Sequence, residues 1–476
     1  MDEQINEQPR TPVRRRRRKS KLQIFKEAYL PIIIAGLAVV MILIFIIGSI
    51  SRSAGKRKEE RESSIQASQE AVNAAKLLDE EARNLLEEAE YLAAGYDMEG
   101  AIAVLDSFSG NLEDFPDLAD KRAEYAAAQS QMTEYSDLSA IPNLSFQLLI
   151  ADPARAFVDA EYGSSYQRNF VTVTEFSNIL QALYDNGYVL VGLRDMITTT
   201  TAEDGSTVYA TKSLYLPADK KPVMLTETQV NYYTFMTDGD GDGKADQNGA
   251  GFASRMVLDT SGNVTTEYIS ADGTVSTGAY DLVPILEAFI AEHPDFSLRG
   301  ARATLAVTGY DGLFGYRTNA GAKDTLGEDA YSQEVAGATQ IAEALRASGY
   351  ELACYTYDNM SYGDAGATEI AADLQHWTDE VTPILGNLDI LVYARNSDIS
   401  DTSTEYSGDK YNTLYNTGFR IYLGTSSSGS TWASVTDSYV RQNRITVTGA
   451  DLVNNPQIYA DLFDATAVVD SARTSD

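Results

Sequence analysis

An uncharged run of 21 residues, Leu30–Ile50, most strongly constrains how this chain is organised. As a helix rising 1.5 Å per residue, it is about as long as the ~30 Å hydrocarbon core of a bilayer is thick. The basic run Arg14–Lys19 precedes it, which favours a cytoplasmic N-terminus. The sequence therefore predicts a single-pass protein of the cell membrane, with a basic cytoplasmic arm (1–28), a transmembrane helix (29–51) and an extracellular remainder. A cleaved signal peptide is the alternative, but its apolar core is usually only ~7–15 residues long.

Charge and composition exclude several classes of protein. Residues 59–476 hold 24 basic and 65 acidic side chains, a net charge near −41, which repels nucleic acid. The single cysteine, Cys354, allows neither an intramolecular disulfide nor a Cys-x-x-Cys pair. His293 and His376 are the only imidazoles. Any histidine-based metal site must therefore use these two residues.

The part after the predicted membrane span divides into two regions of different texture. Residues 56–137 are rich in Ala, Glu, Leu and Lys with apolar residues at helical spacing, and the pattern breaks at Gly95. We interpret this region as a helical stalk that contains a helix hairpin. Residues 138–466 alternate short apolar runs with amphipathic stretches, and a tail follows at 467–476.

The alternation in the second region predicts parallel βαβ units, and hence an α/β barrel or layered domain. The chemistry of such a barrel lies at the C-terminal ends of its strands. The predicted strands are 146–150, 188–193, 222–226, 303–308, 351–355, 389–394 and 419–424. The predicted helices are 173–186, 281–292, 333–348, 367–385 and 457–464.

Three segments of this region carry a family resemblance. FVTVTEFSNILQALYDNGYVLVGL at 170–193, KPVMLT at 221–226 and IAEALRASGYELACYTY at 341–357 resemble the polysaccharide deacetylases. Those are metal-dependent carbohydrate esterases built on a distorted (β/α) barrel, and the resemblance extends from about 142 to 464. It implies a deacetylase-type barrel and a divalent cation held by one carboxylate and two imidazoles.

The residues that the resemblance implies for the metal and the catalytic base are all replaced. The two family aspartates fall at Thr228 and Gln229, and the two histidines at Tyr355 and Asn359. None of these side chains is a carboxylate or an imidazole, so zinc is not expected. His293 precedes a proline at a predicted helix end and His376 lies within a predicted helix. Neither histidine follows a predicted strand, so neither is expected to restore the site.

Other polar residues follow predicted strands and form a second set of candidates. Glu227 follows the strand 222–226, Asp311 and Arg317 follow 303–308 with Tyr310, and Arg395 follows 389–394. They are interpreted either as a glycan-binding cleft or as ordinary loop contacts. An acid and base pair formed by Glu227 and Asp311 is a third interpretation.

An acidic loop is a candidate calcium site. Asp238, Asp240, Asp242 and Asp246 occupy the spacing of the first, third, fifth and ninth positions of a calcium loop. Gly249 stands where a bidentate Glu is expected, so a solvated acidic turn is the alternative. The loop begins a predicted insertion, 237–280, whose turns at 259–263 and 272–273 indicate hairpins.

Three functions remain open from the sequence. The first is a pseudoenzyme that binds cell-envelope glycan or a protein partner without cleaving it. The second is an active carbohydrate deacetylase or hydrolase that acts on acetylated cell-wall polysaccharide through a rearranged site. The third is a structural scaffold of an envelope complex. All three place the barrel outside the membrane and none involves nucleic acid.

Overall fold

The computed structural model describes residues 36, 57–159, 161–237, 251–426 and 429–473. The predicted membrane span lies outside these residues apart from Gly36, and so does the candidate calcium loop from Asp238 to Asp246. Among the described helices, none is both long and apolar enough to cross a bilayer. The described chain forms two compact units, one made of 57–91 and 99–126, the other of 92–98 and the residues from 127 onward.

The first unit is helical, as its Ala-, Leu- and Glu-rich sequence predicts. Helix α3 (Arg57–Ala94) ends just before Gly95, and α4 (Met98–Asp106) and α5 (Pro116–Ser130) follow. The buried side chains of this unit recur at helical spacing. Within its helices they are Ala82, Leu85, Ala89, Ala101, Leu105, Leu118 and Tyr125, and Phe108 is buried just after α4.

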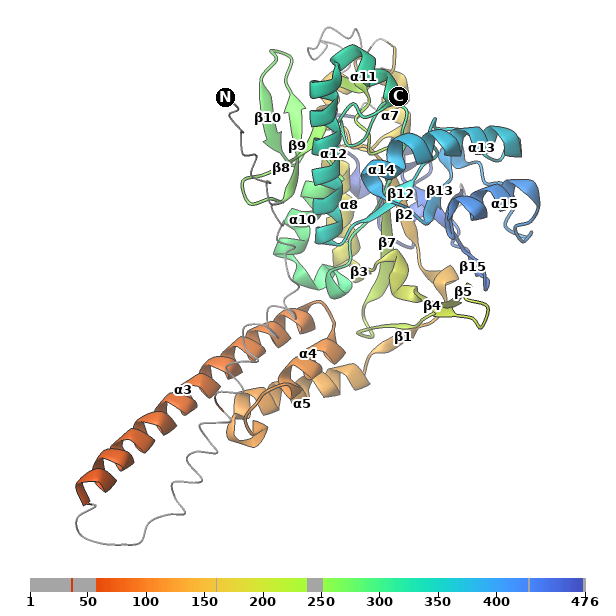
Figure 1. Cartoon of the computed structure of the whole chain (residues 1–476). Coiled ribbons are helices and arrows are strands. Elements are labelled where there is room, and N and C mark those ends of the chain that lie inside the picture. Colours follow the sequence, from red (N-terminus) through yellow and green to blue (C-terminus); the bar gives the residue numbers. More distant parts are fainter. Residues whose placement is uncertain (1–35, 37–56, 160, 238–250, 427–428, 474–476) are drawn as a thin grey trace, which may run out of the picture. The chain divides into compact units, whose positions relative to one another are not determined.

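The second unit contains a closed barrel of seven parallel strands (Figure 1). Each strand pairs with the next one along the chain, and the last strand pairs with the first. The strands are β2 (Asn143–Gln147), β7 (Lys221–Thr228), β11 (Thr304–Val307), β12 (Glu351–Cys354), β13 (Ile390–Val392), β14 (Ile421–Ser426) and β16 (Val440–Thr446). This arrangement confirms the predicted α/β barrel and is consistent with the deacetylase type.

Helices follow the strands and form the outer layer. Helix α8 begins with a capping box, in which the Thr172 hydroxyl accepts from the Glu175 N–H and the Glu175 carboxylate accepts from the Thr172 N–H. The helices are α6 (Pro153–Ala156), α7 (Gly163–Asn169), α8 (Val173–Asp185), α9 (Thr234–Thr237), α10 (Leu282–Glu292), α11 (Ala320–Leu326), α12 (Glu328–Ser348), α13 (Ala367–His376), α14 (Thr382–Leu385), α15 (Gly408–Thr417), α16 (Gly449–Asn454) and α17 (Ala465–Val468). A π-helical turn, Trp377–Val381, joins α13 to α14.

Successive side chains of each barrel strand point alternately into the barrel and outward towards the helices. They form an inner core inside the ring and an outer core between the strands and the helices. In β11, Ala306 belongs to the inner cluster, whereas Leu305 and Val307 belong to the outer cluster beneath the helices. The inner cluster also contains Met224, Val392 and other apolar side chains. A residue that shares the register of Ala306 therefore faces the barrel interior.

Smaller sheets decorate the barrel. The predicted insertion forms an antiparallel sheet of β8 (Arg255–Leu258), β9 (Val264–Ile269) and β10 (Val275–Gly278), with turns at the two predicted positions. Two further antiparallel pairs are β1 (Thr133–Tyr135) with β6 (Leu214–Leu216), and β4 (Ile197–Thr201) with β5 (Thr207–Thr211). Strand β15 (Ala433–Val435) pairs with β16.

The structure differs from the expectations at two elements, and it contains one barrel strand that was not expected. The predicted strand 188–193 is the short β3 (Tyr188–Leu190), which pairs with the start of β7 and lies outside the ring. The predicted helix 457–464 is replaced by a 3₁₀ turn, Pro456–Tyr459, and the later α17, because Pro456 starts a new turn. The strand β16 was not predicted at all.

Candidate functional site

The rim of the barrel, formed by the C-terminal ends of its strands and the residues after them, brings together the four positions implied by the family resemblance. Thr228 is the last residue of β7 and Gln229 follows it, while Tyr355 follows β12. Asn359 lies in the next loop segment. In a closed parallel barrel, the C-terminal ends of all strands lie on one rim. Because each of these residues lies at or shortly after such an end, the barrel brings them to the same rim.

Strained backbone is concentrated at this rim. Every described non-glycine residue with positive φ, apart from Tyr96 and Arg299, follows β7, β11, β12 or β13. Such conformations cost roughly 1–3 kcal/mol each and are found where a functional site needs a special loop shape. The residues are Gln229 and Tyr232, Phe314, Thr356 and Asn359, and Arg395 and Asn396. The rim therefore has the backbone character of a binding or catalytic site.

The four rim positions do not fit a divalent cation. The Thr228 hydroxyl donates to the Phe146 carbonyl at 3.1 Å, and the Gln229 amide donates to the Gln147 side-chain oxygen at 3.2 Å. Tyr355 is 6% exposed, and burial raises its pKa. None of these groups is an anionic or imidazole ligand of the kind that divalent transition metals need.

A buried arginine that sequence reasoning missed lies beside them. Arg444, in β16, is 2% exposed. Its guanidinium donates to the Gly424 carbonyl at 3.1 Å, to the Ser145 hydroxyl at 2.6 Å and to the Tyr393 carbonyl at 3.4 Å. All three acceptors are neutral. Burial without a counter-charge lowers the pKa of Arg444 to about 10, and the nearby Tyr355 opposes this shift only in part. The group is still charged at neutral pH.

A polar band continues below Arg444 inside the barrel. Asn143 of β2 donates to the Gln442 side-chain oxygen at 3.2 Å and accepts from the Thr226 hydroxyl at 2.8 Å. Gln442 in turn donates to the Ile141 carbonyl at 3.2 Å. These polar side chains satisfy one another, which lowers the cost of burying them. Arg444 differs because its positive charge has no such compensation.

The two histidines lie elsewhere. His293 caps the C-terminal end of α10, and its ring contacts Tyr184 and Phe289 at centroid distances of 4.4 and 4.7 Å. His376 ends α13 with 63% of its side chain exposed, 3.6 Å from Glu380. Across the described part of the chain, no group of three or more His, Cys, Asp and Glu side chains is placed to hold a metal ion.

Glu227 and Asp311 lie in different surroundings, and neither carboxylate oxygen of Glu227 has a hydrogen-bond partner among the described residues. Glu227 pairs in register with Phe146 and Leu305, which face the outer core, so its side chain points away from the barrel interior. There burial, with the nearby Asp281, raises the pKa of Glu227 well above its usual value. Asp311 instead accepts from the Thr234 N–H at 2.7 Å.

Asp311 and Arg317 are brought together after β11. The Arg317 guanidinium lies 3.2 Å from the Asp311 carboxylate and also donates to the Tyr232 carbonyl at 2.8 Å. This contact ties the loop after β11 to the loop after β7. Arg395, which is exposed, donates to the Asn359 carbonyl at 2.9 Å and so ties the loops after β12 and β13.

An aromatic row extends along the rim loops that follow β2, β7 and β11. It consists of Tyr162, Phe235, Tyr233 and Tyr310, with successive ring centroids 5.4, 5.5 and 5.1 Å apart. Phe235 is 38% exposed, whereas Tyr233 is buried. Burial raises the pKa of Tyr233, and the proximity of Tyr310 and Tyr355 adds to this shift. The row therefore adjoins the Tyr355 part of the rim.

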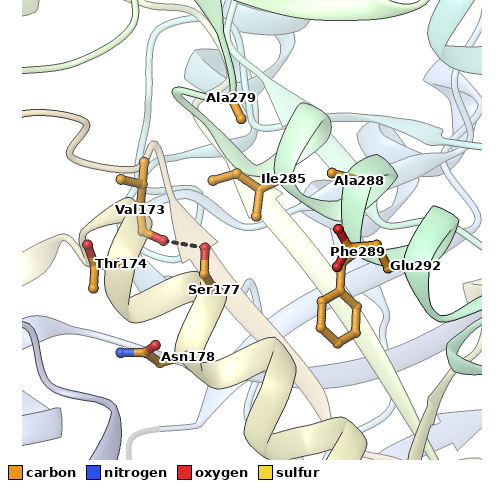
Figure 2. A pocket seen from close by; sticks show the side chains of 9 residues that line it. All are labelled: Val173, Thr174, Ser177, Asn178, Ala279, Ile285, Ala288, Phe289 and Glu292. Atoms are coloured by element: carbon orange, nitrogen blue, oxygen red, sulfur yellow. Dashed lines mark hydrogen bonds between the residues drawn. The ribbon is translucent and has the colours of Figure 1, made fainter.

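A groove on the outer helix layer is separate from these residues. It has a volume of about 470 Å³ and lies between α8 and α10 (Figure 2). One wall bears Ser177, whose hydroxyl donates to the Val173 carbonyl, and the other bears Ile285 and Phe289. The groove contains none of the rim residues described above. The strained backbone and the buried polar side chains are at the rim, so we place the candidate site there.

Comparison with known proteins gives a distant structural likeness. No family model and no curated protein matches this chain. Among solved structures, the chain is similar to the Streptococcus pyogenes deacetylase PplD in complex with acetate. The two share 13% sequence identity over 70% of this chain and 99% of the other, with a TM-score of 0.35.

Proposed function

We propose that this chain is a membrane-anchored, extracytoplasmic protein whose deacetylase-like barrel binds cell-envelope glycan without metal-dependent deacetylation. The observation that carries the proposal is the buried guanidinium of Arg444 beside Tyr355, at the rim where the family resemblance implies metal ligands. A positive charge in a poorly solvated site repels a divalent cation. The anchor rests on the uncharged run Leu30–Ile50.

The aromatic row supports glycan as the ligand. Aromatic rings offer flat apolar faces, and polar groups beside them fix the orientation of a bound small molecule. At this rim, the partly exposed Phe235 and Tyr310 lie in the same row, with Tyr233 between them. Tyr233 is also close to Tyr355. Sugar rings have matching apolar faces and hydroxyl edges. The rim thus combines both kinds of contact.

We expect the purified full chain to contain less than stoichiometric zinc and to release no acetate from acetylated chitooligosaccharide or peptidoglycan. The reason is that Thr228, Gln229, Tyr355 and Asn359 supply no anionic or imidazole ligand. Metal content is measured by mass spectrometry and acetate by a coupled assay, with and without added zinc. Zinc at one ion per chain, together with acetate release, would overturn the proposal.

We expect Phe235→Ala to weaken glycan binding about fivefold, because loss of one stacking face costs about 1 kcal/mol. Binding of chitooligosaccharide is measured by calorimetry on the full chain. Phe289→Ala is the matched control, since Phe289 lines the groove between α8 and α10 rather than the rim. Equal affinities for the two variants would show that the aromatic row is not the binding surface.

A further inference from the structure

The charge of Arg444 is not balanced within the described structure. A guanidinium has five N–H donors, and three of those on Arg444 bind the neutral acceptors Gly424, Ser145 and Tyr393. One donor on each terminal nitrogen is left over, and no described carboxylate lies within 4.0 Å. By contrast Arg441, on the same strand, binds Asp398 at 3.0 Å.

The position of Arg444 makes this imbalance relevant to binding. It bonds to the carbonyl of Tyr393, the residue that directly follows β13, so its guanidinium reaches the level of the rim. A buried cation without a counter-charge destabilises a fold, and an apolar side chain of similar size usually serves stability better. We therefore expect that the positive charge of Arg444 contributes to binding a ligand.

Neighbouring rim groups complete a site for an oxyanion. Tyr355 lies close enough to the Arg444 and Arg395 charges for both to act on its hydroxyl. Arg395 is exposed and brings a second cation to the same loops. The Oδ1 atom of Asn359 is buried without a hydrogen-bond partner, so it can accept from a ligand hydroxyl.

We propose that the rim recognises an anionic group on its glycan ligand, a carboxylate or a phosphate, through Arg444 with Tyr355 and Arg395. The inference rests on the proposed glycan-binding function and adds the chemical class of the ligand. Planar guanidinium groups bind both kinds of oxyanion with paired, charge-assisted hydrogen bonds. The Asn359 oxygen accepts from a sugar hydroxyl beside the anionic group.

The acidic surroundings give this site selectivity. Residues 59–476 have a net charge near −41, which repels anions in general. A ligand whose glycan part also contacts the aromatic row gains additional binding free energy. This gain offsets the repulsion and lets the anionic group reach Arg444. A free small anion is therefore expected to bind weakly.

The test compares four trisaccharide probes on the full chain by calorimetry: trigalacturonic acid, its methyl ester, chitotriose 6-phosphate and chitotriose. We expect an anionic probe to bind about 10–100-fold more tightly than its neutral counterpart, because charge-assisted hydrogen bonds are lost with the charge. A larger gain from the carboxylate than from the phosphate, each relative to its neutral counterpart, identifies carboxylate as the recognised group, and the reverse order identifies phosphate.

Variants assign the preference to Arg444. Arg444→Met should abolish it. The melting temperature is measured alongside to show that the variant is folded, because the substitution removes an uncompensated buried charge but leaves three buried acceptors without their donor. Arg346→Met is the matched control, because Arg346 lies in the last turn of α12 before β12 begins, at the other end of the barrel, and should keep the preference. Tyr355→Phe removes only a hydroxyl and should reduce the preference about 10-fold.

The outcomes separate this inference from the proposed function. If the ester and chitotriose bind but neither anionic probe binds more tightly, the anion site is rejected while glycan binding stands. If Arg444→Met keeps the wild-type preference, the assignment to Arg444 is likewise overturned. If no glycan probe binds to the wild-type chain, both proposals fail.

Discussion

Replacing Arg473 with methionine is expected to lower the free energy of unfolding of the barrel unit by about 3–5 kcal/mol, because it leaves a buried carboxylate without its cation. Glu175 is fully buried at the start of α8, and Arg473 bonds to both of its oxygens. Arg473 also donates to the carbonyls of Gln167 and Phe170 at 2.5 and 2.6 Å. The measurement is urea denaturation of the full chain.

The control for Arg473→Met is Lys323→Met. Lys323 pairs with Glu328 at 2.9 Å, but their side chains are 49% and 70% exposed, so its loss should leave stability nearly unchanged. Adding Glu175→Gln to Arg473→Met should recover part of the lost stability, since the uncompensated charge is then gone. Similar effects for the buried and the exposed pair would contradict the assignment.

The contribution of Glu227 to the stability of the wild-type barrel is expected to fall as pH rises above the ordinary pKa of a glutamate, by up to about 1.4 kcal/mol per pH unit. Burial, with the nearby Asp281, raises the pKa of Glu227 well above its usual value of 4.5. Below that value Glu227 is protonated in both states. Above it the unfolded chain loses this proton while the folded chain retains it, so folding becomes less favourable until pH passes the folded pKa.

Glu227→Gln should remove the contribution of Glu227 to this dependence, because an amide stays neutral at every pH. Burial also raises the pKa of Asp281, which keeps its own contribution. We expect the variant to match the wild type at pH 4 and to exceed it at pH 8, measured by urea denaturation across that range. The contrasting variant is Asp281→Asn, which turns an amide towards the donors of Leu149 and Tyr232 and should destabilise at both pH values. If the free energies of unfolding of the wild type and of Glu227→Gln ran parallel with pH, a raised pKa of Glu227 in the folded state would be ruled out.

Apolar strands were predictable from sequence, whereas the polar one was not. The predicted strands around Leu305, Leu352 and Leu391 fall on barrel strands because both faces of such strands are buried and the runs are continuously apolar. In β16 the buried residues include Arg441, Gln442, Asn443 and Arg444, which resemble an exposed loop by hydropathy. Their polar partners are supplied by distant segments, so no local pattern marks them.

The same distinction holds for the site. The rim location of Thr228 and Tyr355 followed from the rule that parallel strands end together, since each lies at or just after a predicted strand. Arg444 belongs to no motif, and its strand was not predicted. The one available signal was the spacing of Gln442 and Arg444 two residues apart, which places both on one face of a strand. The outward direction of Glu227 required the register of β7 with β11.

Closure of the ring between β2 and β16 has a consequence for folding kinetics. Asn143 bonds to Gln442, 299 residues further along the chain, so β2 gains its second neighbour only when almost the whole sequence is present. Until then β2 and β14 each keep one open edge, which invites pairing with other chains. Such long-range contacts also slow folding. Chains that end before Val440 are therefore expected to aggregate rather than to form a smaller barrel.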